Sequence, residues 1–289
     1  MIPFLMLDEK LVEIEREVIG DIWQSSKMRE TYYYMADELG SRFAGTESEK
    51  KAIEFIVAKL RDYGYGNAHA DTFAYYGWKR GPASLVITEP YDREFPVISL
   101  AMSPGGKVDA EIIDLGTGSP EEFKAVDPSE VEGKIVLCSS ATSPTGIRVH
   151  RRTKYGYAVD SGAVGFIFMN HNQGQLPPTG SVRPAYRLAG EIPGIGISLE
   201  HGSHMKRLAK DRPLRARLTN QSSIIPDTES ANVVCELEGS SKKDEWIVIG
   251  GHFDGHDIAQ GAMDNLSGTV VIMDLARVLK RYAGVFKRS

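Results

Sequence analysis

The sequence predicts an α/β protein with a central mixed, mostly parallel sheet and flanking helices, into which a second α/β unit is inserted. Two observations support this fold class. Apolar stretches of strand length alternate with amphipathic helical patterns along the chain. From about residue 99 to 219 the chain is richer in glycine and proline, with short strands between turns, and afterwards the first texture returns. We therefore expect three segments, 1–98, 99–219 and 220–289, of which the first and third form one domain.

The N-terminal segment is predicted to begin with three helices. Apolar residues recur every three or four positions among charges over residues 7–24 and again over 27–39. The third helix begins at Thr46, has Glu49 three positions later as in a capping box, and ends at Gly64. The first of these helices would pack as an outer layer.

The predicted strands are short apolar stretches bounded by turn residues. They cover residues 68–73, 83–88, 110–115, 134–138, 164–169, 194–198, 231–237 and 246–250. Helices are expected near 151–161 and 201–210 in the inserted segment, and over 265–281 at the end of the chain. Several of these strands are apolar at successive positions, which is typical of strands buried on both faces.

Composition narrows the classes of function. The chain has 289 residues, of which 42% are hydrophobic, enough to fill a core. Its formal net charge of -5 is opposite in sign to that of a typical nucleic-acid binder. No stretch reaches the roughly 18 apolar residues of a membrane span, and the first residues lack a signal-peptide pattern. We therefore expect a globular, cytoplasmic protein without a nucleic-acid or membrane partner, and the sequence leaves a homo-oligomer open.

Some residues that could carry chemistry are better explained by structure. Cys138 and Cys235 lie far apart in predicted strands, which favours buried free thiols over a zinc ribbon or redox pair. His201 and His204 are three apart on a predicted helix, but no further ligand is nearby, so packed or solvated side chains are favoured. The stretch Gly116-Thr117-Gly118 lacks the third glycine of a dinucleotide fingerprint.

The inserted segment contains three pieces in a recognisable order. They are Gly133–Leu137, Ala158–Ile167 and Glu191–Ser198. Together they resemble the protease-associated domain, in which a strand, a helix ending in Gly-Ala, a second strand and an Ile-Pro segment recur. The resemblance implies an element that has no chemistry of its own but limits access to, or shapes, a neighbouring peptidase site.

The strongest candidate site follows the last predicted strand. Two glycines lead into His252 and Asp254, which would point to the same side if strand geometry persists, so that the carboxylate could orient the imidazole. Asp264 lies just before a predicted helix, and one aspartate can bridge two metal ions about 3.5–4 Å apart. A surface turn with a histidine salt bridge is the alternative. The spacing to Gly261–Gly268 and the adjacent protease-associated segment favour a metal site. His256 and Asp257 are assigned no role.

These motifs resemble the dinuclear-zinc aminopeptidase family, which includes aminopeptidase Y and the glutamate carboxypeptidases. The residues that carry the resemblance are Leu39–Thr46, His252-x-Asp254, Gly261–Asn265 and Ser267-Gly268. The resemblance implies a zinc-dependent exopeptidase that acts on peptides through water activated by two zinc ions. It also implies that His252 ligates one zinc, that Asp264 bridges both, that Asp254 orients His252, and that the Asp264–Asn265 peptide bond is cis.

The family's site needs further groups that this sequence does not show. The resemblance implies a glutamate pair that supplies the general base and a ligand, then another carboxylate and a final histidine. No glutamate here matches that pattern. We therefore expect this chain to be a fragment that carries the first half of the site, lacks activity alone, holds zinc poorly and exposes an apolar sheet edge.

Two other functions predict different residues. A non-catalytic, receptor-like member of the same superfamily would have lost its metal site, whereas His252, Asp254 and Asp264 are intact. A subtilase with the same insert would need a serine nucleophile in a Gly-x-Ser or Gly-Thr-Ser-Met setting, and none is found. The sequence does not distinguish an aminopeptidase from a carboxypeptidase or a dipeptidase.

Overall fold

The computed structural model describes residues 9–210 and 212–289, which form two compact units. One unit joins the chain up to Tyr75 with Glu229–Ser289, and the other comprises Tyr76–Thr228. Helices and a mixed sheet make up the chain, which confirms the predicted α/β class. The boundaries expected near residues 99 and 219 both fall inside the second unit.

The second unit contains the large sheet. Its strands are β2 (Ala83–Glu89), β3 (Arg93–Phe95), β4 (Val97–Ser99), β5 (Gly106–Asp114), β6 (Ile135–Ser139), β7 (Gly165–Met169), β8 (Gly194–Ile197) and β9 (Arg215–Asn220). They are ordered β3-β2-β9-β5-β6-β7-β8-β4. Strands β5 to β8 pair in parallel, whereas β3, β2, β9 and β4 join through antiparallel pairs. The stretch 83–88, which we expected in the other domain, therefore belongs to this sheet.

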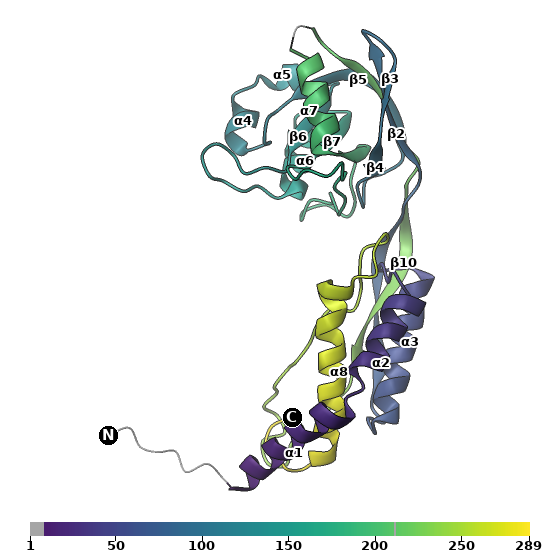
Figure 1. Ribbon diagram of the computed structural model, residues 1–289, viewed down its shortest axis with the longest axis vertical. Helices are drawn as coiled ribbons and strands as arrows, with labels where there is room; N and C mark the ends of the chain where they lie inside the picture. Colours follow the sequence, from purple (N-terminus) through teal and green to yellow (C-terminus); the bar gives the residue numbers. More distant parts are fainter. Residues whose placement is uncertain (1–8, 211) are drawn as a thin grey trace, which may run out of the picture. The chain divides into compact units, whose positions relative to one another are not determined.

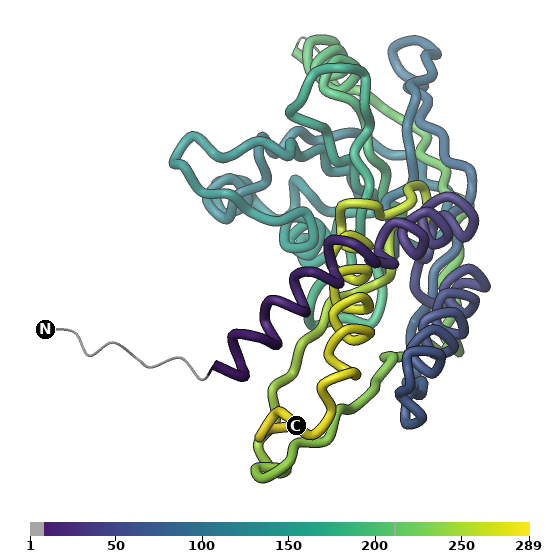
Figure 2. The backbone as a smooth tube through the Cα atoms, turned by 60° about the horizontal axis from the view of Figure 1, so that its bottom comes forward, coloured from purple at the N-terminus to yellow at the C-terminus, as the bar shows by residue number. Residues whose placement is uncertain are grey.

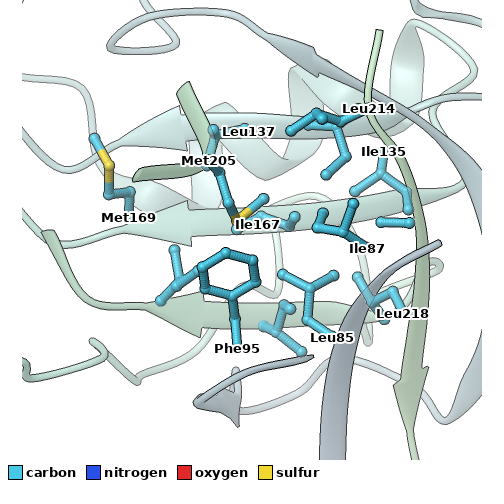
Figure 3. Packing of buried hydrophobic residues seen from close by; sticks show 14 of the residues in the cluster. Leu85, Ile87, Phe95, Ile135, Leu137, Ile167, Met169, Met205, Leu214 and Leu218 are labelled. Atoms are coloured by element: carbon cyan, nitrogen blue, oxygen red, sulfur yellow. The ribbon is translucent and has the colours of Figure 1, made fainter. Parts of the chain in front are cut away.

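Both faces of this sheet are buried. Ile135 and Leu137 of β6 belong to one apolar cluster, which is shown in Figure 3, and the alternate residues Val136 and Cys138 belong to another. This alternation follows from the two-residue period of a strand. The helices of the unit are α4 (Pro120–Lys124), α5 (Pro128–Val131), α6 (Arg151–Asp160) and α7 (Leu199–Leu208), shown in Figure 1. Met205 of α7 packs in the first cluster.

The first unit is mainly helical. Its helices are α1 (Glu9–Ser25), α2 (Met28–Tyr33), α3 (Glu47–Asp62) and α8 (Ser267–Leu279), with π-helical turns η1 (Tyr34–Glu38) and η2 (Ala262–Leu266) and a 3-10 turn η3 (Lys280–Tyr282). Strands β1 (His69–Lys79) and β10 (Ser223–Val234) pair with each other and run across the boundary between the units. The four predicted helices are confirmed here, although the expected start at Leu7 lies outside the described residues.

The core of the first unit joins α3 to α8. Ile56 and Leu60 of α3 pack in one cluster with Val270 and Met273 of α8. The position of α3 is fixed at its start, because the hydroxyl of Thr46 accepts a hydrogen bond from the Glu49 backbone N–H at 3.3 Å. The apolar cluster shared by α3 and α8 therefore holds the start of α8 against α3.

The strand expected over residues 246–250 does not form, and this prediction is wrong. The segment pairs with no strand among the described residues, and Trp246, Ile247, Val248 and Ile249 are all more than half exposed. Ile247 N–H donates to the carbonyl of Ser289, and Figure 2 shows the chain end beside this region. An apolar pattern predicts burial, but a strand also requires a neighbouring strand to accept its hydrogen bonds. Nothing among the described residues supplies one.

The two cysteines are free thiols. Cys138 is buried, as predicted, and burial raises the pKa of its thiol, whereas Cys235 is only half-buried. Within the described residues, no helix combines the length and the apolar character that crossing a membrane requires.

Candidate metal site

The predicted site residues come together in the first unit. His252 Nδ1 lies 2.9 Å from Asp254 Oδ1, and His252 Nε2 lies 3.0 Å from Asp264 Oδ1. One imidazole therefore stands between two carboxylates, and each ring nitrogen faces one of them. All three side chains are open to solvent, with 56% of His252, 44% of Asp254 and 91% of Asp264 exposed. The site is thus accessible to an ion and to a substrate.

The start of α8 positions both halves of this arrangement. The Thr269 hydroxyl, on the first turn of α8, donates a hydrogen bond to the carbonyl of His252 at 3.0 Å. Asp264 precedes the same helix within η2, where its φ of -118° and ψ of 94° are not helical. The Asp264–Asn265 peptide bond is cis, as the family resemblance implied. His252 and Asp264 are therefore held by one helix end.

The charges around His252 favour its protonated form. Burial lowers the pKa of the imidazole, but the hydrogen bond and charge of Asp254, together with those of Asp264, outweigh burial and leave the pKa raised. A proton on Nε2 then lies between the imidazole and the Asp264 carboxylate. That is also the position a metal ion would take between the same two donor atoms.

The residues present suit zinc but supply only part of its coordination. An imidazole nitrogen and a carboxylate oxygen are ordinary zinc ligands, and here they converge on one point. The carboxylate on the second ring nitrogen is the usual support for a metal-bound histidine. Among residues 9–210 and 212–289, however, no group of three or more His, Cys, Asp or Glu could hold a metal ion. The donor set fits zinc and is incomplete within the described part of the chain.

Two buried charged residues near the site were not identified from the sequence. Arg42 is fully buried and donates hydrogen bonds to backbone carbonyls, including that of Phe253 at 2.8 Å. Glu49 is 3% exposed and accepts hydrogen bonds from Gly45 N–H at 2.6 Å and from the Ser230 hydroxyl at 2.7 Å. Burial raises the pKa of Glu49 despite these bonds. The Thr46 hydroxyl still accepts from Glu49 N–H, but the Glu49 carboxylate binds Gly45 and Ser230 in place of the Thr46 backbone N–H that a capping box would give it.

The histidine pair of the second unit is packed. The rings of His201 and His204 each make an edge-on contact with Phe95, with ring centroids 5.9 Å apart. His201 Nδ1 also lies 3.1 Å from the hydroxyl of Ser198, which caps α7. This arrangement agrees with the packing role that was favoured over a metal pair.

A large groove adjoins the site within the first unit. Its volume is about 1630 Å³, and its lining includes His252 and Asp254 together with apolar residues of β10, α8 and the 246–250 segment. The apolar wall includes Val233, Ile249 and Met273. The candidate site therefore borders an apolar groove in the same unit.

Two family models match parts of the chain. Residues 232–289 match the model of Peptidase family M28, and residues 97–205 match the PA domain. The first match contains His252, Asp254 and Asp264, and the second lies within the second unit. One part of the chain is thus similar to the M28 peptidases and another to the PA domain, which confirms the resemblance to the zinc aminopeptidases.

Individual relatives agree with this class. The chain is 26% identical over 253 residues to carboxypeptidase Q of Mus musculus, which covers 85% of this chain and 53% of that protein. It is 25% identical to leucine aminopeptidase 2 of Trichophyton equinum, over 84% of this chain and 46% of that protein. The chain thus spans about half the length of the curated relatives it matches.

Solved structures show the same fold. The M28 peptidase precursor of Shewanella amazonensis matches with a TM-score of 0.74 and 24% identity, over 93% of this chain and 63% of that chain. The aminopeptidase of Aneurinibacillus sp. strain AM-1 matches with a TM-score of 0.68 and 24% identity, over 88% of this chain and 58% of that chain.

Proposed function

We propose that this chain supplies the His252, Asp254 and Asp264 part of the metal centre of a zinc-dependent exopeptidase. The observation that carries the proposal is the meeting of His252 Nε2 and Asp264 Oδ1 at 3.0 Å, with Asp254 on the other ring nitrogen. The M28 match over the same residues and the relatives named as peptidases support it. The substrates would be peptides.

Each residue has a distinct part in this proposal. His252 binds zinc through Nε2, and Asp254 fixes the orientation of the ring by accepting a hydrogen bond from Nδ1. Asp264 binds zinc through the oxygen that faces His252, and its exposed second oxygen leaves room for a second ion. Bound zinc supplies an activated water and polarises the scissile carbonyl. The exopeptidase uses two such ions.

The chain by itself is expected to bind zinc weakly and to lack peptidase activity. Structural and catalytic zinc sites use three or four protein ligands, whereas His252 and Asp264 supply two. A general base is also required to take the proton of the attacking water. Asp254 and Asp264 cannot supply the missing ligands or the base, because both carboxylates already contact His252.

Zinc titration of the purified 289-residue chain, in competition with a chromophoric chelator, tests the site. We expect weak binding that His252→Ala and Asp264→Ala abolish. His204→Ala, in the second unit, is the matched control and should change nothing. Tight stoichiometric binding would contradict the weak-binding proposal, and binding that survives both substitutions would place the zinc elsewhere.

A second experiment tests the activity in the native protein. The protein is purified from its source cells with an antibody against the second unit and assayed on aminoacyl anilides and short peptides. We expect hydrolysis that a chelator removes and added zinc restores. A native protein without such activity, which nevertheless binds other proteins through this chain, would support the non-catalytic alternative.

A further inference from the structure

Arg42 makes an unusual set of contacts in the first unit. Its guanidinium has five N–H donors and is fully buried. The acceptors are five backbone carbonyls: Phe253 at 2.8 Å, Met35 at 2.8 Å, Gly40, Gln260 at 2.7 Å, and Gly261 at a longer 3.5 Å. The planar fork of one side chain thus satisfies carbonyls from three separate stretches of backbone.

Three of these carbonyls belong to the loop that separates the two halves of the site. The loop runs from Phe253 to Gly261, directly after His252 and shortly before Asp264. Arg42 binds it at both ends, and its own backbone carbonyl also accepts a hydrogen bond from Gly255 N–H at 3.1 Å. One residue therefore holds the beginning and the end of the loop.

The loop closes tightly where Arg42 binds it. An added Cβ on Gly255 would lie 3.2 Å from Gly261 Cα, so the two glycine backbones are in direct contact. Gly261 has a φ of +58°, which favours glycine, and an added Cβ there would lie 3.1 Å from Arg42 Nη2. The guanidinium therefore packs against the point where Gly255 and Gly261 meet, and a larger side chain at either position would prevent this contact.

We propose that Arg42 is a positioning residue of the metal site, which closes the 253–261 loop and so keeps Asp264 within bonding distance of His252. The expected effect of Arg42 on metal binding rests on the proposed function. The contacts themselves are independent of any metal. Arg42 acts through the backbone of the loop, because the acceptors of its side chain are backbone carbonyls.

The energetic cost of this arrangement argues for a positioning role. Burial lowers the pKa of Arg42, because removing a cation from water is unfavourable, and the nearby charge of Asp254 offsets this only in part. Apolar residues of similar volume often give equal or greater stability than a buried charge. What an apolar side chain lacks is directional donors that fix several carbonyls at once. The geometry therefore points to the loop as the reason for the arginine.

The test compares Arg42→Lys with wild type. Lysine keeps the charge but loses the planar fork, so it cannot bind both ends of the loop. Arg61→Lys is the matched control, because the Arg61 side chain also donates to a backbone carbonyl in this unit, that of Ala68 at 3.0 Å, on the far end of α3 from the site. Amide hydrogen exchange and His252-dependent zinc binding are measured for all three proteins.

In Arg42→Lys we expect faster exchange over residues 253–261 with unchanged exchange in α3 and α8. Zinc affinity should fall about 10- to 100-fold, the usual effect of losing a supporting contact. Unchanged exchange in the loop, or exchange that rises equally throughout α3 and α8, would overturn the proposal. So would full zinc affinity despite a loosened loop. If the wild-type chain did not bind zinc at His252, the proposed function would be refuted. Amide hydrogen exchange of residues 253–261 would still decide whether Arg42 closes the loop.

Discussion

Asp274 is a buried carboxylate on α8 that joins three parts of the first unit. It is 2% exposed and accepts hydrogen bonds from the Ser26 hydroxyl at 2.9 Å, from Lys27 N–H at 3.0 Å and from Arg277 Nε at 2.7 Å. Arg277 in turn pairs with Asp21 of α1. Burial raises the pKa of Asp274, but these donors outweigh burial and leave the pKa lowered.

Asp274→Asn is expected to destabilise the first unit by about 3 kcal/mol at pH 7, because it removes one of the two carboxylates that pair with the buried Arg277 and leaves only Asp21. The folded pKa of Asp274 lies below the unfolded value of about 4, so its contribution is present above pH 4 and is lost as pH falls through the folded pKa. Urea denaturation at pH 7 and pH 3 measures this. The difference between variant and wild type should shrink at pH 3, and Asp62→Asn, at an exposed position on α3, should have little effect at either pH.

At this scale the sequence indicated candidate site residues that the structure brings together, but it did not indicate the residues that support them. His252, Asp254 and Asp264 were identified because their side chains carry the chemistry and their spacing is local. Arg42 was noticed only as part of a motif, since its acceptors are carbonyls, which every residue has and no sequence pattern marks. Its burial depends on packing between segments more than 200 positions apart.

Among the elements, the segment 246–250 shows where apolar patterning fails as a guide. The pattern is that of a buried strand, but Val248 is 89% exposed and the segment pairs with no strand among the described residues. Pairing partners cannot be read from the segment itself. The same applies to β2, whose partners β3 and β9 include one more than 120 positions away. By contrast, the capped helix α3 was predicted well, because its signals lie within the helix.

Exposed apolar strand-like segments promote association between chains. We therefore expect Val248→Lys to reduce self-association at high protein concentration without lowering stability, because Val248 makes little buried contact. Sedimentation velocity over a concentration series measures association. Leu188→Lys, at an exposed apolar position of the second unit, is the control and should change association less. Equal effects of both substitutions would mean that 246–250 is not the main associating segment.

For the whole molecule, the two units have separate cores. The two apolar clusters of the large sheet consist of residues between 83 and 218, whereas the third cluster draws only on the other unit. The α/β class and the presence of an insert were predicted from changes in texture along the chain. The extent of the second unit was not predicted, because β2 and β3 precede the glycine-rich stretch and do not share its composition.

Residues 76–228 are therefore expected to fold without the rest of the chain. About 150 residues bury enough surface for independent stability, and the whole eight-stranded sheet lies within this range. Cooperative urea unfolding and amide NMR shifts that match those of the intact chain would confirm this. A non-cooperative transition would show that the sheet needs the first unit. The fragment 99–219 serves as a comparison and should fail, because it lacks β2 and β3.

The ends of the second unit lie side by side. An added Cβ on Gly77 would lie 2.6 Å from the hydroxyl oxygen of Thr228, so the chain leaves and re-enters the first unit at nearly one point. A gene segment encoding such a unit can be gained, lost or exchanged between relatives by recombination without moving the flanking residues apart. The ribbon formed by β1 and β10 would thus act as a splice point, at which one unit is exchanged in evolution while the core of the other stays unchanged.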